Sequence, residues 1–141
     1  RPLSVNWADK HVPAIVEAWY PGSQGGKALA DILFGDYNPG GKLTVTFLRT
    51  VGQIPFNFPH KPSSQVDGGN KTGLTGNMSR VNGALYPFGY GLSYTTFKYS
   101  DLAFSSEKIT PEQSLVVRCR VTNTGSKAGD EVVTLLCTSR M

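Results

Sequence analysis

The block from Tyr20 to Leu43, YPGSQGGKALADILFGDYNPGGKL, constrains the fold of this 141-residue chain more than any other stretch. It joins a glycine-rich turn to a short run with helical spacing and then to a second tight turn. The apolar side chains of the run recur on one helix face, at Ala28, Leu29, Ile32 and Leu33. The pattern predicts a helix of about three turns. Gly35 is expected to end it in the left-handed conformation.

Strand-like patterns flank this helix on both sides. Downstream, Asn38-Pro39-Gly40-Gly41 combines a proline of fixed φ with glycines that tolerate positive φ, so a chain reversal is expected. Leu43, Val45 and Phe47 then alternate with polar residues, as in a half-buried strand. Upstream, the apolar run at 12–19 indicates a mostly buried strand. The order strand, helix, strand over about 36 residues is that of one α/β unit.

The glycines of this block do not form a nucleotide site. Gly26-Lys27 and Gly41-Lys42 look like the end of a phosphate-binding loop, but Ala28 and Leu43 follow where a hydroxyl is needed to hold magnesium. No cofactor is therefore expected. The loop Tyr20 to Gly25 leaves a strand and opens a helix, where open α/β sheets receive ligands. The alternative is that its glycines only let the strand and helix pack closely.

A second motif-rich block, LYPFGYGLSYTTF, begins at Leu85. Its Gly91-Leu92-Ser93-Tyr94-Thr95 resembles part of a hydrolase nucleophile elbow. That elbow requires glycine two residues after the serine, and Thr95 stands there. Ser93 is therefore assigned a structural role.

These blocks carry a family resemblance. The stretches PAIVEAWYPGSQGGKALADILFGDYNPGGKLTVTF, VGQIPFNFPHKP and ALYPFGYGLSYTTF resemble, in the same order, the late part of glycoside hydrolase family 3, the β-glucosidase and β-xylosidase group. The resemblance implies α/β followed by all-β. Residues 1–60 would end an α/β sandwich domain, residues 61–92 would form a linker, and residues 93–141 would begin a fibronectin type III-like β-sandwich.

The resemblance also implies a chemistry. Family members are retaining glycosidases, which use two carboxyl groups about 5 Å apart. The family's nucleophile lies in an N-terminal barrel domain, and its acid/base lies upstream of the PG-containing block, so both are expected before Arg1. No catalytic residue is assigned in this chain, although Glu17 is notable because it interrupts an apolar run. The parent would hydrolyse terminal β-linked glucose or xylose, and the fragment alone would be inactive.

The middle of the chain, from about Arg49 to Gly83, is predicted to be a long loop because its prolines and glycines break any apolar period. Long loops are often functional. Four of its side chains could line a sugar site, since rings stack on sugar faces and charged groups bond hydroxyls: Phe56, Phe58, His60 and Lys61. The favoured alternative is that the two phenylalanines only anchor the loop to the α/β body.

The composition limits the kinds of binding partner that are expected. The net charge is +4, but the 14 basic residues are scattered, so nucleic-acid binding is not expected. No apolar run is long enough to span a membrane. The two histidines stand alone and no metal site is predicted. Cys119 and Cys137 are expected to be small buried side chains without a disulfide. The expected partner of the parent is a β-glucoside or β-xyloside oligosaccharide.

The end of the chain departs from the family pattern. A fibronectin-like sandwich has about seven strands over some 100 residues, and far fewer residues follow Ser93 here. Strands are predicted at 115–121 and 131–136. An incomplete sandwich leaves an apolar face uncovered, which predicts poor solubility or self-association.

The start of the chain lacks an apolar run typical of a signal peptide. The resemblance places residue 1 inside a longer protein, and many relatives are exported, so the parent is expected to be periplasmic or secreted. Two other hypotheses stay open: a noncatalytic carbohydrate-binding or structural module, and a defective product without function.

Overall fold

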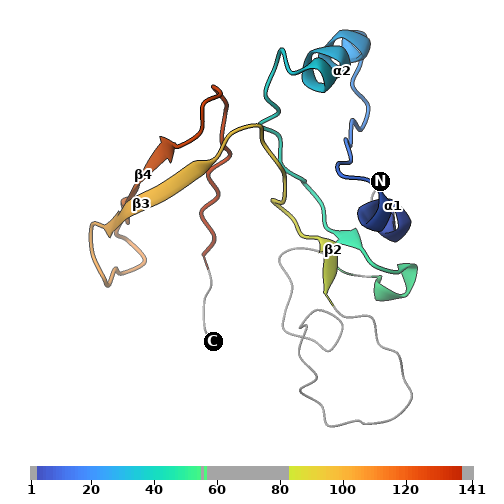
Figure 1. Cartoon of the computed structure of the whole chain (residues 1–141). Helices are drawn as coiled ribbons and strands as arrows, with labels where there is room; N and C mark the ends of the chain where they lie inside the picture. Colours follow the sequence, from blue (N-terminus) through green and yellow to red (C-terminus); the bar gives the residue numbers. More distant parts are fainter. Residues whose placement is uncertain (1–2, 55, 57–82, 138–141) are drawn as a thin grey trace. The chain divides into compact units, whose positions relative to one another are not determined.

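The computed structural model describes residues 3–54, 56 and 83–137 of the chain. Two compact units are present in the described residues. The first unit comprises Arg1–Leu29, Lys42–Gly91 and Thr134–Met141, as far as these are described, and the second comprises Ala30–Gly41 and Leu92–Val133. The elements in chain order are α1 (Asn6–His11), α2 (Gly25–Phe34), β1 (Phe47–Leu48), η1 (Val51–Gln53), β2 (Ala84–Tyr86), β3 (Phe97–Phe104) and β4 (Val117–Asn123) (Figure 1).

The helix predicted in the opening block is confirmed as α2, which has 10 residues. Gly35 follows it with φ of 83°, a left-handed conformation that ends the helix. Gly25, at the start of α2, is buried, and a Cβ there would overlap the Pro21 ring. The predicted apolar stripe is only partly covered, because Leu33 remains 66% exposed.

The first unit contains the two-stranded antiparallel sheet β1–β2, in which Phe47 lies opposite Tyr86. The strand predicted from Leu43 to Phe47 is shorter than expected. Only Phe47–Leu48 is a strand, and the pairing shifts register between these two residues. Leu43 nevertheless exchanges two backbone hydrogen bonds of 2.8 Å, with Gly89 and Tyr90.

The core of the first unit is small and aromatic. Its buried apolar side chains are Phe47, Phe56 and Leu85, which are 4%, 8% and 8% exposed. The Phe47 ring contacts those of Trp19 and Tyr86, each with centroids 6.2 Å away. Two strands that meet at one buried ring therefore hold this unit together.

The prediction of a strand at 12–19 is wrong. The structure assigns no strand there, and the backbone turns at Trp19, which has φ of 50°. Ile15 and Val16 are 43% and 49% exposed. An extended run becomes a strand only when a neighbouring backbone pairs with it. No such ladder forms for this run in the described part of the chain.

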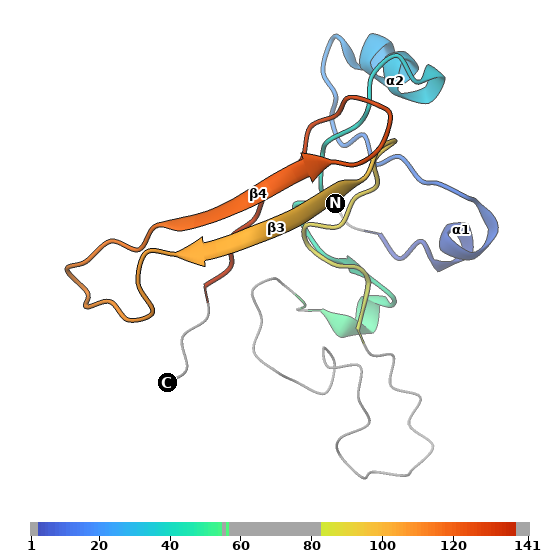
Figure 2. The ribbon, with the colours of Figure 1, turned by 60° about the vertical axis from the view of Figure 1, so that its left-hand side comes forward.

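The second unit contains the antiparallel hairpin β3–β4, whose pairing runs from Phe97 opposite Asn123 to Phe104 opposite Val117 (Figure 2). The strand predicted at 115–121 is thus found two residues later, as β4. The strand predicted at 131–136 is not formed, and β4 pairs with the earlier β3 instead.

A bulge interrupts β3 between Ser100 and Ala103. Asp101, at the bulge, has φ of 54°, and its carboxylate lies 2.6 Å from Nε of Arg120 on β4. The left-handed conformation in a bulge is normally adopted by glycine, and Asp is one of the few other residues that tolerate it.

The expected burial of the cysteines is wrong. Cys119 and Cys137 are both free and exposed. In the second unit, Leu102 and Phe104 of the hairpin are also more than half exposed. A second layer would be needed to bury Cys119 on β4, and none covers it among the described residues of this unit.

Among the described elements, the two α-helices precede residue 35 and those from Ala84 onward are strands. The expected fold, α/β followed by all-β, is confirmed only in the coarser sense that the described chain has few helices and several strands. Within the described ranges, no helix has the length and apolar character needed to cross a bilayer.

Candidate functional site

Glycoside hydrolysis needs carboxyl groups, and several carboxylates of this chain accept hydrogen bonds from tyrosines. In the first unit, Tyr86 donates its hydroxyl to Oδ1 of Asp9 at 2.7 Å. This hydrogen bond, with burial and the Asp9 charge, raises the pKa of Tyr86 to about 12. Asp9 thus joins α1 to β2.

Glu17, the least readily explained acid in the sequence, has a local partner. Its Oε1 accepts a hydrogen bond of 3.0 Å from the backbone N–H of Trp19, two residues further on. Trp19 has positive φ, which costs free energy for a bulky residue. The carboxylate therefore stabilises an unfavourable turn, and no second carboxyl group of the described residues is bonded to it.

Two carboxylates of the second unit also accept from tyrosines. Tyr37 donates to Oδ2 of Asp130 at 2.9 Å, and this bond raises the pKa of Tyr37. Tyr99 donates to Oε1 of Glu131 at 2.9 Å. Its pKa is raised by burial and then by this bond. These carboxylates act as acceptors that join segments of the unit.

The most densely bonded polar group of the second unit is the Asn38 side chain, in the turn after α2. Its Oδ1 accepts from the Ser93 hydroxyl at 3.0 Å and from the Tyr94 backbone N–H at 2.8 Å. Its Nδ2 donates to the Ala128 carbonyl at 2.9 Å. Asn38 is only 8% exposed. The structural role predicted for Ser93 is confirmed by this bond.

Sequence reasoning missed Asn38 as a hub and treated it only as part of a turn. Its partners lie 55 to 90 residues away in the sequence. The one available signal was an asparagine directly before Pro39-Gly40-Gly41, which is equally typical of an ordinary turn.

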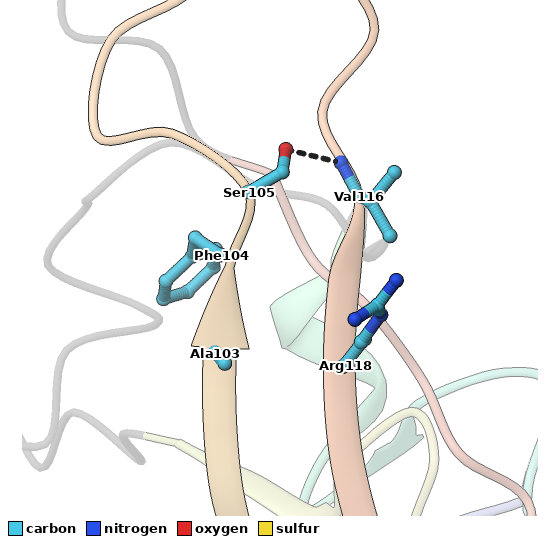
Figure 3. Close-up of a pocket in the computed structure, with 5 residues that line it drawn as sticks. All are labelled: Ala103, Phe104, Ser105, Val116 and Arg118. Carbon is cyan, nitrogen blue, oxygen red and sulfur yellow. Dashed lines mark hydrogen bonds between the residues drawn. The ribbon is translucent and has the colours of Figure 1, made fainter.

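An open hollow of about 150 Å³ lies beside the far end of the hairpin. Figure 3 shows its lining residues, Ala103, Phe104, Ser105, Val116 and Arg118. The Ser105 hydroxyl is occupied, because it accepts from the Val116 N–H at 3.0 Å. No carboxyl group lines the hollow, so it lacks the acid and the nucleophile of a glycosidase.

Of the four predicted sugar-loop residues, only Phe56 is described, and it is buried. Phe58, His60 and Lys61 lie outside the described residues, so the role of this loop stays a prediction. The other candidate loop, Tyr20 to Gly25, leaves Tyr20 95% exposed. Its first helical amide, of Gly25, already donates to the Gly22 carbonyl at 3.2 Å.

Metal binding receives no support from the geometry. Among the residues that the structure describes, no three His, Cys, Asp or Glu side chains gather where a metal ion could bind. His11 stacks on Trp7 with ring centroids 4.7 Å apart, and its Nδ1 lies 2.6 Å from the Trp7 carbonyl oxygen.

Comparison with known proteins shows the family. A sequence model described as the glycosyl hydrolase family 3 C-terminal domain matches residues 1–94. A periplasmic β-glucosidase of Salmonella typhimurium is 44% identical over 135 residues, covering 94% of this chain and 18% of that protein. A β-xylosidase of Formosa agariphila is 43% identical over 133 residues, with the same two shares.

A solved structure agrees with the sequence matches. A β-glucosidase from Erythrobacter marinus superimposes with a TM-score of 0.76 and 45% identity, over 92% of this chain and 16% of that one. The chain belongs to glycosyl hydrolase family 3, as its motifs predicted, and residues 1–94 match the C-terminal domain of that family. It spans less than a fifth of the length of these three relatives.

Proposed function

We propose that this chain is the C-terminal part of a retaining β-glycosidase whose parent removes terminal β-linked glucose or xylose from oligosaccharides. The observation that carries the proposal is the similarity over 94% of the chain to both a β-glucosidase and a β-xylosidase. The choice between the two sugars is left to the part of the parent that supplies the catalytic residues.

The chain alone is proposed to be inactive. Retention needs two free carboxyl groups about 5 Å apart. In the described residues, Asp9, Asp130 and Glu131 accept from tyrosine hydroxyls, and Glu17 accepts from the backbone N–H of Trp19. These bonds support a structural role for the four acids. The nucleophile and the acid/base would then come from another part of the parent protein.

Incubation of the purified chain with a chromogenic β-glucoside and a chromogenic β-xyloside tests this proposal. A full-length β-glucosidase of the family serves as the positive control, and the expected result is no release of chromophore above the blank. Turnover that a Glu17→Gln variant abolishes would show that the chain carries its own catalytic acid. Binding of a glucan without turnover would instead favour the noncatalytic carbohydrate-binding module.

The finer architecture is part of the same proposal. Residues 1–60 would form the C-terminal part of the α/β sandwich domain, and residues 61–92 would form a linker. Residues 93–141 would begin a fibronectin type III-like sandwich. The antiparallel hairpin β3–β4 supports the last assignment, since such sandwiches consist of antiparallel strands. The parent would be periplasmic or secreted, as the name of the Salmonella relative suggests.

The isolated chain is proposed to self-associate through the hairpin. Leu102 and Phe104 are 64% and 55% exposed, and exposed apolar surface favours association. Sedimentation velocity at rising concentration tests this, with a Leu102→Lys, Phe104→Lys double variant expected to stay monomeric. A Leu33→Lys change on α2 is the matched control and should leave association unchanged. A monomer at all concentrations would exclude the proposal.

A further inference from the structure

Segments far apart in the sequence are joined within the second unit by side-chain hydrogen bonds. The turn after α2 contributes Tyr37 and Asn38, and the segment before β3 contributes Tyr94. Tyr37 bonds Asp130 at 2.9 Å, and Tyr94 donates its hydroxyl to the Ile32 carbonyl at 2.8 Å. Asn38 bonds both the segment before β3 and the segment after β4.

These contacts differ in burial. Tyr37 and Tyr94 are 52% and 48% exposed, whereas Asn38 is 8% exposed. Water can replace the tyrosine bonds as soon as they break. A buried amide that loses its partners instead keeps the full cost of desolvation. Asn38 is therefore the contact whose loss matters most.

The chemistry of asparagine suits this position. One side-chain amide supplies an acceptor for Ser93 and Tyr94 and a donor for Ala128. Alanine supplies neither. Packing adds to the bonds, because a Cβ on Gly129 would overlap Nδ2 of Asn38. The backbone of the segment after β4 thus approaches the amide more closely than any other residue type would allow.

We propose that Asn38 is a clasp that fastens the open end of the β3–β4 hairpin, where β3 begins and β4 ends, to the turn after α2. When the clasp is broken, residues 92–96 and 123–131 detach together as one local unfolding unit. Loss of the Asn38 bonds thus lets this end of the hairpin unfold locally while the first unit stays folded.

Amide hydrogen exchange by NMR on the full chain tests the clasp. The reporter is the Thr124 amide, which donates to the Thr96 carbonyl at 2.8 Å and not to Asn38. The Leu43 amide, bonded to the Tyr90 carbonyl, reports on the first unit. Asn38→Ala is expected to speed exchange at Thr124 at least tenfold and to leave Leu43 within twofold.

Asn6→Ala is the matched control, because Asn6 also donates one side-chain amide bond, to the Arg49 carbonyl, but within the first unit. It should leave Thr124 unchanged. Two results of Asn38→Ala would overturn the proposal: unchanged exchange at Thr124, or faster exchange at both reporters, since the latter means that the whole chain unfolds rather than the hairpin alone.

A double-mutant cycle supplies a second measurement. Gly129→Ala alone should open the clasp, because the added methyl group displaces the Asn38 amide, and should speed exchange at Thr124 to a similar extent. In the Asn38→Ala background the overlap with Nδ2 is gone and only the milder contact with the Thr95 methyl group, at 3.3 Å, remains. Adding Gly129→Ala should then change exchange less than twofold. If the double variant instead raised the exchange rate at Thr124 by the product of the two single effects, the two residues would act independently, and this would refute the clasp.

Discussion

In the first unit the central group is a ring, Phe47, and in the second it is a side-chain amide, Asn38. Phe47 is 4% exposed and contacts the rings of Trp19 and Tyr86. Asn38 is 8% exposed and makes three hydrogen bonds. The ring stabilises by removing apolar area from water, which requires no direction. The amide stabilises only when each partner lies at the correct distance and angle.

This difference predicts different responses to substitution. A core ring tolerates small shifts of its neighbours, and its truncation costs free energy in proportion to the lost contacts and the cavity. A polar hub loses all its bonds at once. Substitutions at Phe47 should therefore depend on the size of the new side chain, and substitutions at Asn38 on its hydrogen-bonding groups.

The largest expected effect is that of Phe47→Ala. Truncation of a buried phenylalanine costs about 3–5 kcal/mol, and the small core of the first unit has few other rings to compensate. Urea denaturation followed by tryptophan fluorescence measures the loss, since Trp19 contacts Phe47. Phe104→Ala is the control, because Phe104 is 55% exposed and should cost under about 1 kcal/mol. Equal costs for both would contradict a core centred on Phe47.

A smaller effect is expected at Gln53, the polar hub of the first unit, which is 2% exposed. Its Oε1 accepts from the N–H groups of Arg49 and Thr50, and its Nε2 donates to the Gly83 carbonyl at 3.0 Å. Gln53→Ala leaves these groups unsatisfied and should cost about 1–3 kcal/mol.

Gln53→Glu separates the two roles of this side chain. A carboxylate still accepts from both N–H groups but cannot donate to Gly83, so it should retain part of the stability in urea denaturation. If Gln53→Glu proved as costly as alanine, the bond to Gly83 would carry the whole effect.

Local features of the fold were predictable from the sequence, and distant pairings were not. The end of α2 at Gly35 follows from a glycine that tolerates positive φ, and the structural role of Ser93 followed from Thr95 after it. The strand expected at 12–19 failed because its apolar pattern specifies burial but not a pairing partner. Asn38 was missed for the same reason, since its partners are up to 90 residues away.

The candidate site shows the same limit. The motifs identified the family, and the comparisons confirmed it over residues 1–94. Cys119 was predicted to be a small buried side chain, and it is exposed instead. A residue's environment depends on what packs over it, and the local pattern of a strand does not contain that information.

An intermediate loss of folding stability is expected at alkaline pH, where Tyr86 ionises. The hydrogen bond to Asp9 raises the pKa of Tyr86 from 10.0 to about 12. Because the folded pKa is the higher one, the stabilisation is fully present below pH 10 and is lost as the pH rises through about 12. Titration of phenolate absorbance should show one tyrosine ionising near pH 12, and this step should be absent in Tyr86→Phe.

Asp9→Asn separates this bond from a general effect of alkali. The amide oxygen still accepts from Tyr86 but carries no charge, so the pKa of Tyr86 should fall toward 10. In the unmodified chain the pKa of Tyr37, which is bonded to Asp130 in the second unit, should also be raised. A Tyr86 that ionises near pH 10 in the unmodified chain would mean that α1 is not held to β2 by this bond.

The smallest effect is expected at Asp101, where two contributions oppose each other. Asp101→Gly relieves a left-handed φ of 54° that costs a side chain free energy, but it removes the ion pair with Arg120. Both side chains are well exposed, and such pairs contribute about 0–1 kcal/mol. The net change in unfolding free energy should therefore lie within about 0.5 kcal/mol.

Salt resolves the two contributions at Asp101. Screening weakens an exposed ion pair, so raising the ionic strength should make Asp101→Gly more favourable relative to the unmodified chain, while the backbone contribution stays constant. Arg120→Gln removes the pair without changing the backbone, and its small cost should vanish at high salt. A salt-independent cost for both would show that the bulge is held by its backbone alone, and the second unit would then depend still more on the clasp at Asn38.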